Sequence, residues 1–206
     1  MEVTIPRLIL ASRSPQRRAI LEQIGVDFDV VVPNVEELTQ GEPGAVVVEN
    51  ALRKARAVGA PDRPGACRGV RGAEPPGGYP LVLGCDTEVV LGGRVYGKPR
   101  DAAEAEGFLR ELSGREHQVV SGLALIDGGR EVTATAWTGV SFRELDDQTL
   151  RWYLEGGEWR ERAGGYAIQG RGAALVERID GDYLNVVGLP LASLLGLKPS
   201  LPLLHR

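Results

Sequence analysis

Asp86 is the first residue whose position suggests chemistry. It stands in the motif Gly84-Cys85-Asp86-Thr87, inside the apolar run Leu81–Leu91. Burying an isolated carboxylate costs roughly several kcal/mol, so such an acid must be paired, metal-bound or neutral. Asp86 is therefore a candidate to activate water or to hold a hard metal ion. The alternatives are a carboxylate at a strand end facing water, or a structural partner for a buried arginine.

The segment Ser12-Arg13-Ser14-Pro15-Gln16-Arg17-Arg18 is the second candidate. It follows an apolar run, and Ser14-Pro15 has the form of an N-cap followed by the first residue of a helix. Free N–H groups at a helix start, together with hydroxyls and guanidiniums, favour phosphate binding. The alternative is that Ser14 only caps the helix and the arginines form a solvated face.

Lysine is rare in this chain, because only Lys54, Lys98 and Lys198 are lysine among the 24 basic side chains. An ammonium is a compact charge that can approach a phosphate oxygen where a planar guanidinium does not fit. Lys54 and Lys98 are therefore candidate phosphate ligands, and chance retention on the surface is the alternative, above all for Lys198.

The run Gly92 to Lys98 matches the spacing of a phosphate-binding P-loop, but Pro99 replaces the hydroxyl that this loop needs for magnesium. Gly92-Gly93 is better interpreted as the turn of a hairpin. We reject the P-loop and keep Lys98 as a residue near the same end of the sheet as Asp86.

No nucleophile motif is present in the sequence. It has no G-x-S-x-G elbow, and His117 lacks the companions of a triad, so a turn or hydrogen-bonding role is expected for it. Cys67 and Cys85 have no C-x-x-C spacing, which predicts reduced thiols. What remains is an inventory of acids and cations that suits oxygen-ligated magnesium and phosphate: Glu37, Asp86, Arg17, Lys54 and Lys98.

The elements that must position these residues alternate between strands and helices. We expect strands at 7–11, 28–32, 81–91, 94–96, 118–126 and 131–142, and helices from Ser14 to Gly25 and at 45–58, 101–112, 147–154 and 190–195. Val48, Leu52 and Ala55 are expected to form the buried face of the second helix. Residues 173–179 and 183–187 are expected to pair as a last hairpin. The hairpins rule out a purely parallel sheet, so the fold class is α/β with a mixed sheet.

Composition limits the function classes. The chain has 206 residues, 43% of them hydrophobic and 25% charged, which predicts a single domain over 1–206 that folds alone. Residues 59–80, with 11 Gly or Pro, are expected to be a flexible surface insertion. The net charge of -4 argues against a nucleic-acid polymer as partner. The apolar runs are too short to cross a membrane, and the N-terminus is unlike a signal peptide, so a cytoplasmic location is expected.

Several separated blocks resemble the Maf family of nucleotide pyrophosphatases. The first block is Leu10 to Arg18, the others follow it in the family's order, and the resemblance as a whole spans about Leu8 to Leu195. They are Val35-Glu36-Glu37, Ala51–Ala55 around Lys54, Gly84-Cys85-Asp86-Thr87, Gly97-Lys98-Pro99, Leu112-Ser113-Gly114, Ala163–Gly170 and Val187–Leu191.

The resemblance implies an elongated mixed sheet with flanking helices and two lobes around a cleft, as in inosine triphosphate pyrophosphatases. It also implies hydrolysis of a nucleoside triphosphate to monophosphate and pyrophosphate by a homodimer. The cofactor would be a divalent cation, Mg²⁺ or else Mn²⁺ or Co²⁺.

By the family pattern, Asp86 is the proton acceptor for the attacking water. Glu37 and Asp86 would hold the metal. Phosphates would be bound by Ser12, Ser14, Arg17, Lys54 and Lys98.

In this family, base choice is associated with the positions of Gln16, Thr87 and Gln169. Thr87 and Gln169 resemble the branch that acts on dTTP and UTP. Gln16 departs from the arginine usual there, and an amide lacks the charge and the fork of a guanidinium. The same reaction on modified or purine nucleotides is the alternative, and a nucleotide-binding regulator of septum formation without turnover is a second one.

Overall fold

The computed structural model of the chain describes residues 8–59 and 80–201. The expected insertion at 59–80 lies outside these ranges except for its two end residues, and Cys67 lies outside them as well. The elements in chain order are β1 (Leu8–Ala11), α1 (Pro15–Gln23), β2 (Phe28–Val30), α2 (Pro43–Gly59), β3 (Leu81–Leu91), β4 (Arg94–Tyr96), α3 (Ala102–Leu112), β5 (Glu116–Asp127), β6 (Arg130–Phe142), α4 (Asp147–Glu155), the 3-10 helices η1 (Ala163–Gly165) and η2 (Gly170–Ala174), β7 (Val176–Asp180), α5 (Tyr183–Val187) and α6 (Leu191–Leu197).

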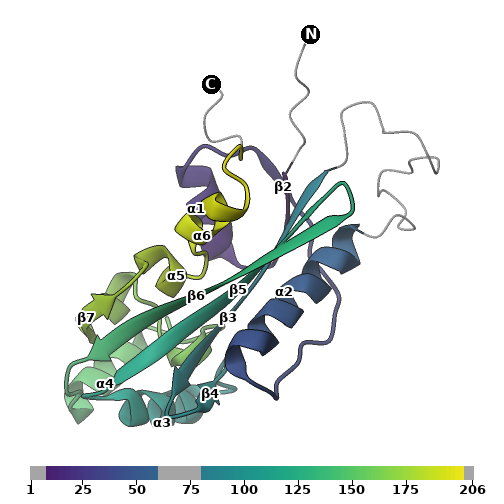
Figure 1. Ribbon diagram of the computed structural model, residues 1–206. Coiled ribbons are helices and arrows are strands. Elements are labelled where there is room, and N and C mark those ends of the chain that lie inside the picture. Colours follow the sequence, from purple (N-terminus) through teal and green to yellow (C-terminus); the bar gives the residue numbers. More distant parts are fainter. Residues whose placement is uncertain (1–7, 60–79, 202–206) are drawn as a thin grey trace. The chain divides into compact units, whose positions relative to one another are not determined.

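A seven-stranded mixed sheet organises the fold (Figure 1). Its strand order is β2-β1-β3-β5-β6-β7, and β4 also pairs with β3. β1 is parallel to both β2 and β3, whereas β4 is antiparallel to β3 and β7 is antiparallel to β6. The expected mixed α/β sheet is therefore confirmed.

The β3–β4 hairpin follows the sequence prediction closely. Gly92 and Gly93 connect the two strands with φ angles of 58° and 83°. Left-handed conformations at both positions are those of the tight turn that suits the twist of paired strands. Lys98 consequently follows the return strand of a hairpin, not a phosphate-binding loop.

The chain folds into two compact units, in agreement with the two lobes that the resemblance implied. Of the described residues, the first unit comprises 8–59, 80–86, 122–135 and 191–201, and the second comprises 87–121 and 136–190. Strands β3, β5 and β6 contribute residues to both units.

In the first unit, α2 lies along one side of the sheet, and α1 and α6 lie on the other side (Figure 1). The buried face of α2 shares only Ala55 with the one that we expected. Val47, Ala51 and Ala55 are fully buried, whereas Val48 and Leu52 are only half-buried. The same buried face carries Asn50 and Lys54. Because these two residues are polar, the spacing of apolar residues does not indicate this face.

The core of the second unit is richer in aromatic residues. Phe142, Tyr153, Trp159 and Tyr166 pack there with aliphatic side chains from α3, α4 and β5. His117 lies among them, 1% exposed, and its Nε2 is 2.8 Å from the hydroxyl of Tyr166. The hydrogen-bonding role expected for His117 is confirmed.

The expected last hairpin is wrong in its second half. Residues 176–180 form β7, but Tyr183–Val187 form the helix α5. Asp182 caps this helix by accepting a 2.8 Å hydrogen bond from the backbone N–H of Leu184. Asn185 is fully buried and donates to the backbone oxygen of Val119 and to Thr138, at 3.1 and 3.0 Å. These contacts override the strand preference of an aromatic and β-branched run.

None of the helices within residues 8–59 and 80–201 is both long enough and apolar enough to cross a membrane.

Candidate active site

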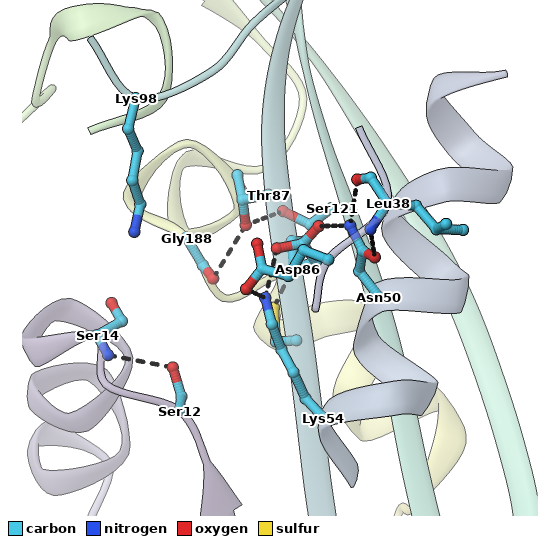
Figure 2. A network of polar contacts seen from close by, with 12 residues as sticks. Ser12, Ser14, Leu38, Asn50, Lys54, Asp86, Thr87, Lys98, Ser121 and Gly188 are labelled. Carbon is cyan, nitrogen blue, oxygen red and sulfur yellow. Dashed lines mark hydrogen bonds and ion pairs between the residues drawn. The ribbon is translucent and has the colours of Figure 1, made fainter. Parts of the chain in front are cut away.

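Asp86 lies at the centre of a cluster of polar side chains that includes Lys54 and Asn50 (Figure 2). It lies on β3, and only 5% of its surface is exposed. Lys54 donates to its Oδ1 at 2.6 Å, and the amide nitrogen of Asn50 donates to its Oδ2 at 2.9 Å. Lys54 and Asn50 are one turn apart on α2, so one helix face supplies both donors.

Glu37 is the second carboxylate at this centre. Its Oε1 lies 2.9 Å from Nζ of Lys54, which therefore joins Glu37 to Asp86. The Glu37 side chain is 48% exposed, whereas that of Asp86 is 7% exposed. One ammonium thus links a buried acid to an acid that reaches solvent.

Asn50 also fixes the segment that carries Glu37. Its Oδ1 accepts from the backbone N–H of Leu38 at 2.7 Å, and its Nδ2 donates to the carbonyl oxygen of Leu38 at 3.0 Å. The amide therefore connects Asp86 on β3 to the backbone next to Glu37. Sequence reasoning missed Asn50, although its spacing of four residues from Lys54 was visible.

Two glycines allow α2 to come this close to the sheet. A Cβ added to Gly84 on β3 would lie 2.1 Å from the backbone oxygen of Ala51. A Cβ added to Gly122 on β5 would lie 2.3 Å from the backbone oxygen of Val47. Only residues without a side chain fit at this approach, so these glycines set how far Lys54 reaches toward Asp86.

The pKa of Asp86 is lowered by its surroundings. Burial raises the pKa, but the charge and hydrogen bond of Lys54, the hydrogen bond of Asn50 and the charge of Arg17 together outweigh burial. The carboxylate is therefore ionised at neutral pH and can accept a proton. Its oxygens retain lone pairs beyond the bonds from Lys54 and Asn50.

A second polar group in the first unit lies where β1 passes into α1. Ser14 caps α1 by accepting from the backbone N–H of Arg17 at 3.3 Å. Ser12 accepts from the backbone N–H of Ser14 and from the guanidinium of Arg17, both at 3.1 Å. Arg17 and Ser12 are 8% and 4% exposed, so these two side chains form a largely buried cluster, whereas Arg13 and Arg18 are exposed, as the alternative of a solvated face expected. The N–H groups at the start of a nine-residue helix add positive potential to it.

The side-chain amide oxygen of Gln16 already accepts a hydrogen bond. The hydroxyl of Ser14 donates to Oε1 of Gln16 at 3.1 Å. The amide NH₂ group of Gln16 makes no hydrogen bond to any other residue within 8–59 and 80–201. Gln16 therefore presents a hydrogen-bond donor.

Three of the predicted residues belong to the second unit. Thr87 directly follows Asp86 in the chain, and its hydroxyl is 2.8 Å from that of Ser121 and 3.4 Å from the carbonyl oxygen of Gly188. Lys98 is exposed and pairs with Glu161 at 3.1 Å. Gln169 is exposed and directly precedes η2.

Glu37 and Asp86 fit a divalent cation that binds its substrate's phosphates as well. Within the described residues, no group of three or more His, Cys, Asp or Glu side chains could enclose a metal ion. Mg²⁺ is commonly held by one or two carboxylates together with phosphate oxygens and water. Glu37 and Asp86 are the two carboxylates at this centre that could hold such a cation, and Glu37 reaches solvent.

Comparison with known proteins identifies the family of this chain. Residues 7–198 match the family model described as "Maf-like protein". The chain belongs to the Maf-like family. The family resemblance identified from the motifs is thereby confirmed.

Curated relatives agree with this membership. A protein of Symbiobacterium thermophilum, named dTTP/UTP pyrophosphatase, is 49% identical over 187 residues, which cover 90% of this Maf-like chain and 89% of the relative. One of Deinococcus radiodurans, with the same name, is 42% identical over 195 residues, covering 94% of this chain and 92% of the relative. Among solved structures, the Staphylococcus aureus Ham1 protein matches with a TM-score of 0.44 at 16% identity, over 66% of this chain and 71% of that one.

Proposed function

We propose that this Maf-like protein hydrolyses nucleoside triphosphates, with dTTP and UTP as preferred substrates, to nucleoside monophosphate and pyrophosphate. The observation that carries the proposal is the buried, ionised carboxylate of Asp86, held by Lys54 and Asn50. The curated relatives named dTTP/UTP pyrophosphatase supply the substrate class.

The proposed reaction is attack of water on the α-phosphorus. The bond between that phosphorus and the oxygen bridging to the β-phosphorus breaks, and pyrophosphate leaves with the bond electrons. Asp86 accepts the proton that the water loses, and its lowered pKa then favours release of the proton to solvent. Lys54 keeps Asp86 oriented and ionised through its 2.6 Å contact.

Glu37 and Asp86 would hold the divalent cation, which when bound neutralises phosphate charge and favours ionisation of water. Ser12, Ser14 and Arg17 are proposed to bind phosphate. The proposal is supported by the positive end of α1 and by the Ser12 hydroxyl, which accepts two bonds and has its own proton left to donate. Roles for Lys98, Thr87 and Gln169 in substrate binding stay predictions from the resemblance. A cytoplasmic location and a homodimer also stay predictions.

Gln16 supports the preference for dTTP and UTP. Because Ser14 donates to its Oε1, the amide of Gln16 offers N–H groups to a ligand. Thymine and uracil each carry two carbonyl oxygens that accept such a bond, whereas cytosine replaces one of them by an amino group. The same donor could bond a carbonyl of a modified purine, which is why the alternative substrate class is included in the test.

The test is to incubate the full chain and Mg²⁺ with dTTP, UTP, CTP, GTP, 7-methyl-GTP and ITP, and to measure pyrophosphate and orthophosphate separately. We expect pyrophosphate from dTTP and UTP, and a loss of about 10²- to 10⁴-fold in Asp86→Asn, the range for removal of a general base. Asp147→Asn is the matched control, since Asp147 forms an exposed pair with Arg110.

Pyrophosphate from another base alone would move the substrate class to the alternative. Orthophosphate as product would exclude the proposed bond cleavage. Nucleotide binding without product, unchanged in Asp86→Asn, would favour the regulator.

A further inference from the structure

Within residues 8–59 and 80–201, the guanidinium of Arg162 in the second unit has no hydrogen-bond or ion-pair partner. Its side chain is half-buried, and its Nε is fully shielded from solvent. Burial lowers the pKa of Arg162, which reflects the cost of desolvating the charge. A buried polar group without a protein partner in a native fold is bound by water or an ion, or serves a function.

The acidic side chains around Arg162 are engaged elsewhere. Glu158 accepts from the backbone N–H groups of Arg171 and Gly172 at 3.0 and 3.2 Å. Glu161 extends into solvent with a side chain that is 83% exposed, and it pairs with Lys98. Both act on Arg162 only through their charge.

Tyr153 also lies near enough to act on Arg162 electrostatically, but it supplies no anion at neutral pH. Burial raises the pKa of Tyr153 to about 12. Its hydroxyl oxygen accepts from the backbone N–H of Ala167 at 3.0 Å. Arg162 is therefore left as an available cation.

A backbone hydrogen bond joins the loop that carries Lys98 to the loop that carries Arg162. The N–H of Gly164 donates to the carbonyl oxygen of Gly97 at 3.1 Å. Gly164 has a φ of 69°, and a Cβ there would lie 2.9 Å from Val89, so no other residue fits without strain. Lys98 follows Gly97 directly, and Arg162 precedes Gly164 by two residues.

The pair between Lys98 and Glu161 does not block this arrangement. Its two side chains are 63% and 83% exposed, and ion pairs of such exposure contribute little. A polyanion that reaches Lys98 can displace the Glu161 carboxylate into solvent.

We infer that Arg162 and Lys98 form an anion site in the second unit, and that its ligand is pyrophosphate or the corresponding part of a nucleoside triphosphate. The ligand identity rests on the proposed function, because that reaction supplies pyrophosphate. A guanidinium offers paired N–H donors that match two oxygens of one phosphate, and an ammonium offers a point charge to a neighbouring phosphate. Arg162 then acts as a positioning residue for the phosphate chain.

The test is calorimetric titration of the full chain with inorganic pyrophosphate. We expect Arg162→Met to weaken binding about 10- to 100-fold, the range for lost hydrogen bonds to a charged group, and Arg162→Lys to recover part of it. Arg160→Met is the matched control, because this change removes the same charge from the same loop at an exposed residue that already stacks on Trp159 at 4.6 Å.

Thermal unfolding separates this role from a structural one. Neutralising an unpaired, half-buried cation should leave the melting temperature of Arg162→Met equal to the wild type or higher. A lower melting temperature with unchanged pyrophosphate affinity would overturn the proposal, and so would a wild type that does not bind pyrophosphate.

The outcome is independent of turnover. A protein that releases no pyrophosphate from any nucleotide, yet loses pyrophosphate affinity in Arg162→Met, would keep the anion site and reject the proposed reaction. Normal turnover with wild-type affinity in Arg162→Met would reject the anion site alone.

Discussion

The side-chain nitrogen of Asn50 lies 2.9 Å from Oδ2 of Asp86 and 3.0 Å from the carbonyl oxygen of Leu38. A single amide thereby orients the proposed base and ties down the segment that carries Glu37. Because this amide is 1% exposed, water cannot replace it without rearrangement.

Replacing Asn50 should therefore affect both activity and stability. We expect Asn50→Ala to lower kcat about 10- to 100-fold and the free energy of unfolding by about 1–3 kcal/mol, since it removes a bond to a charged group and leaves the N–H of Leu38 unpaired. Asn50→Asp should also move the acid limb of the pH–rate profile upward, because a second carboxylate beside Asp86 disfavours ionisation. Asn34→Asp, at an exposed position, is the control, and equal profiles for both variants would contradict a positioning role for Asn50.

Gln16 should determine base choice through its donor. Gln16→Glu replaces the NH₂ group by an acceptor, so we expect kcat/KM for UTP to fall at least about tenfold, whereas Gln16→Arg keeps a donor and should retain the preference for UTP over CTP. Steady-state kinetics with both nucleotides measures this. The matched control is Gln23→Glu, at the exposed end of α1. An unchanged UTP-to-CTP ratio in Gln16→Glu would show that the base does not contact this amide.

His117 should make the protein less stable in mild acid. Burial lowers its pKa from 6.5 to about 4, so the folded state keeps the imidazole neutral while the unfolded state takes up a proton. Stability is therefore lost as pH falls from about 6.5 to about 4, by up to about 1.4 kcal/mol per pH unit.

Urea unfolding at pH 7 and at pH 4.5 measures this loss. His117→Gln can still hydrogen-bond Tyr166 but does not titrate, so it should lose about 2–3 kcal/mol less than the wild type between the two pH values. The same loss in both proteins would mean that other groups cause the acid sensitivity.

Gly84 should tolerate no side chain. In Gly84→Ala the new Cβ would meet the backbone oxygen of Ala51 at 2.1 Å, which forces α2 away from β3. We expect a loss of about 1–3 kcal/mol or more in the free energy of unfolding, with a fall in turnover because Lys54 and Asn50 move with the helix. The control is Gly107→Ala on α3, where no atom lies within 4 Å of the added Cβ and a gain of about 0.5–1 kcal/mol is expected. Equal stabilities would exclude a tight approach of α2.

The sequence predicted correctly those helices and strands whose ends depend on residues nearby in the chain. Ser14-Pro15 began α1 as expected, and the apolar run 81–91 matches β3 to the residue. The helix expected at 101–112 is α3, in which Asp101 is the N-cap and accepts from the N–H of Glu104 at 2.8 Å.

Signals from distant contacts were not available to sequence reasoning. Asn50 owes its role to Asp86, 36 residues later, and α5 owes its helical form to the contacts of Asn185 with β5 and β6. In the site, the residue types indicated which acids and cations take part. They did not indicate that Lys54 pairs with both Glu37 and Asp86, because no spacing in the sequence shows which cation contacts which acid.

The two compact units are interleaved along the chain, with boundaries after Asp86, Ser121, Thr135 and Pro190. A break at any point between 87 and 190 would therefore divide both units at once. If two related genes recombine inside this interval, each unit of the product contains residues from both parents. We therefore expect the region to be inherited as one block.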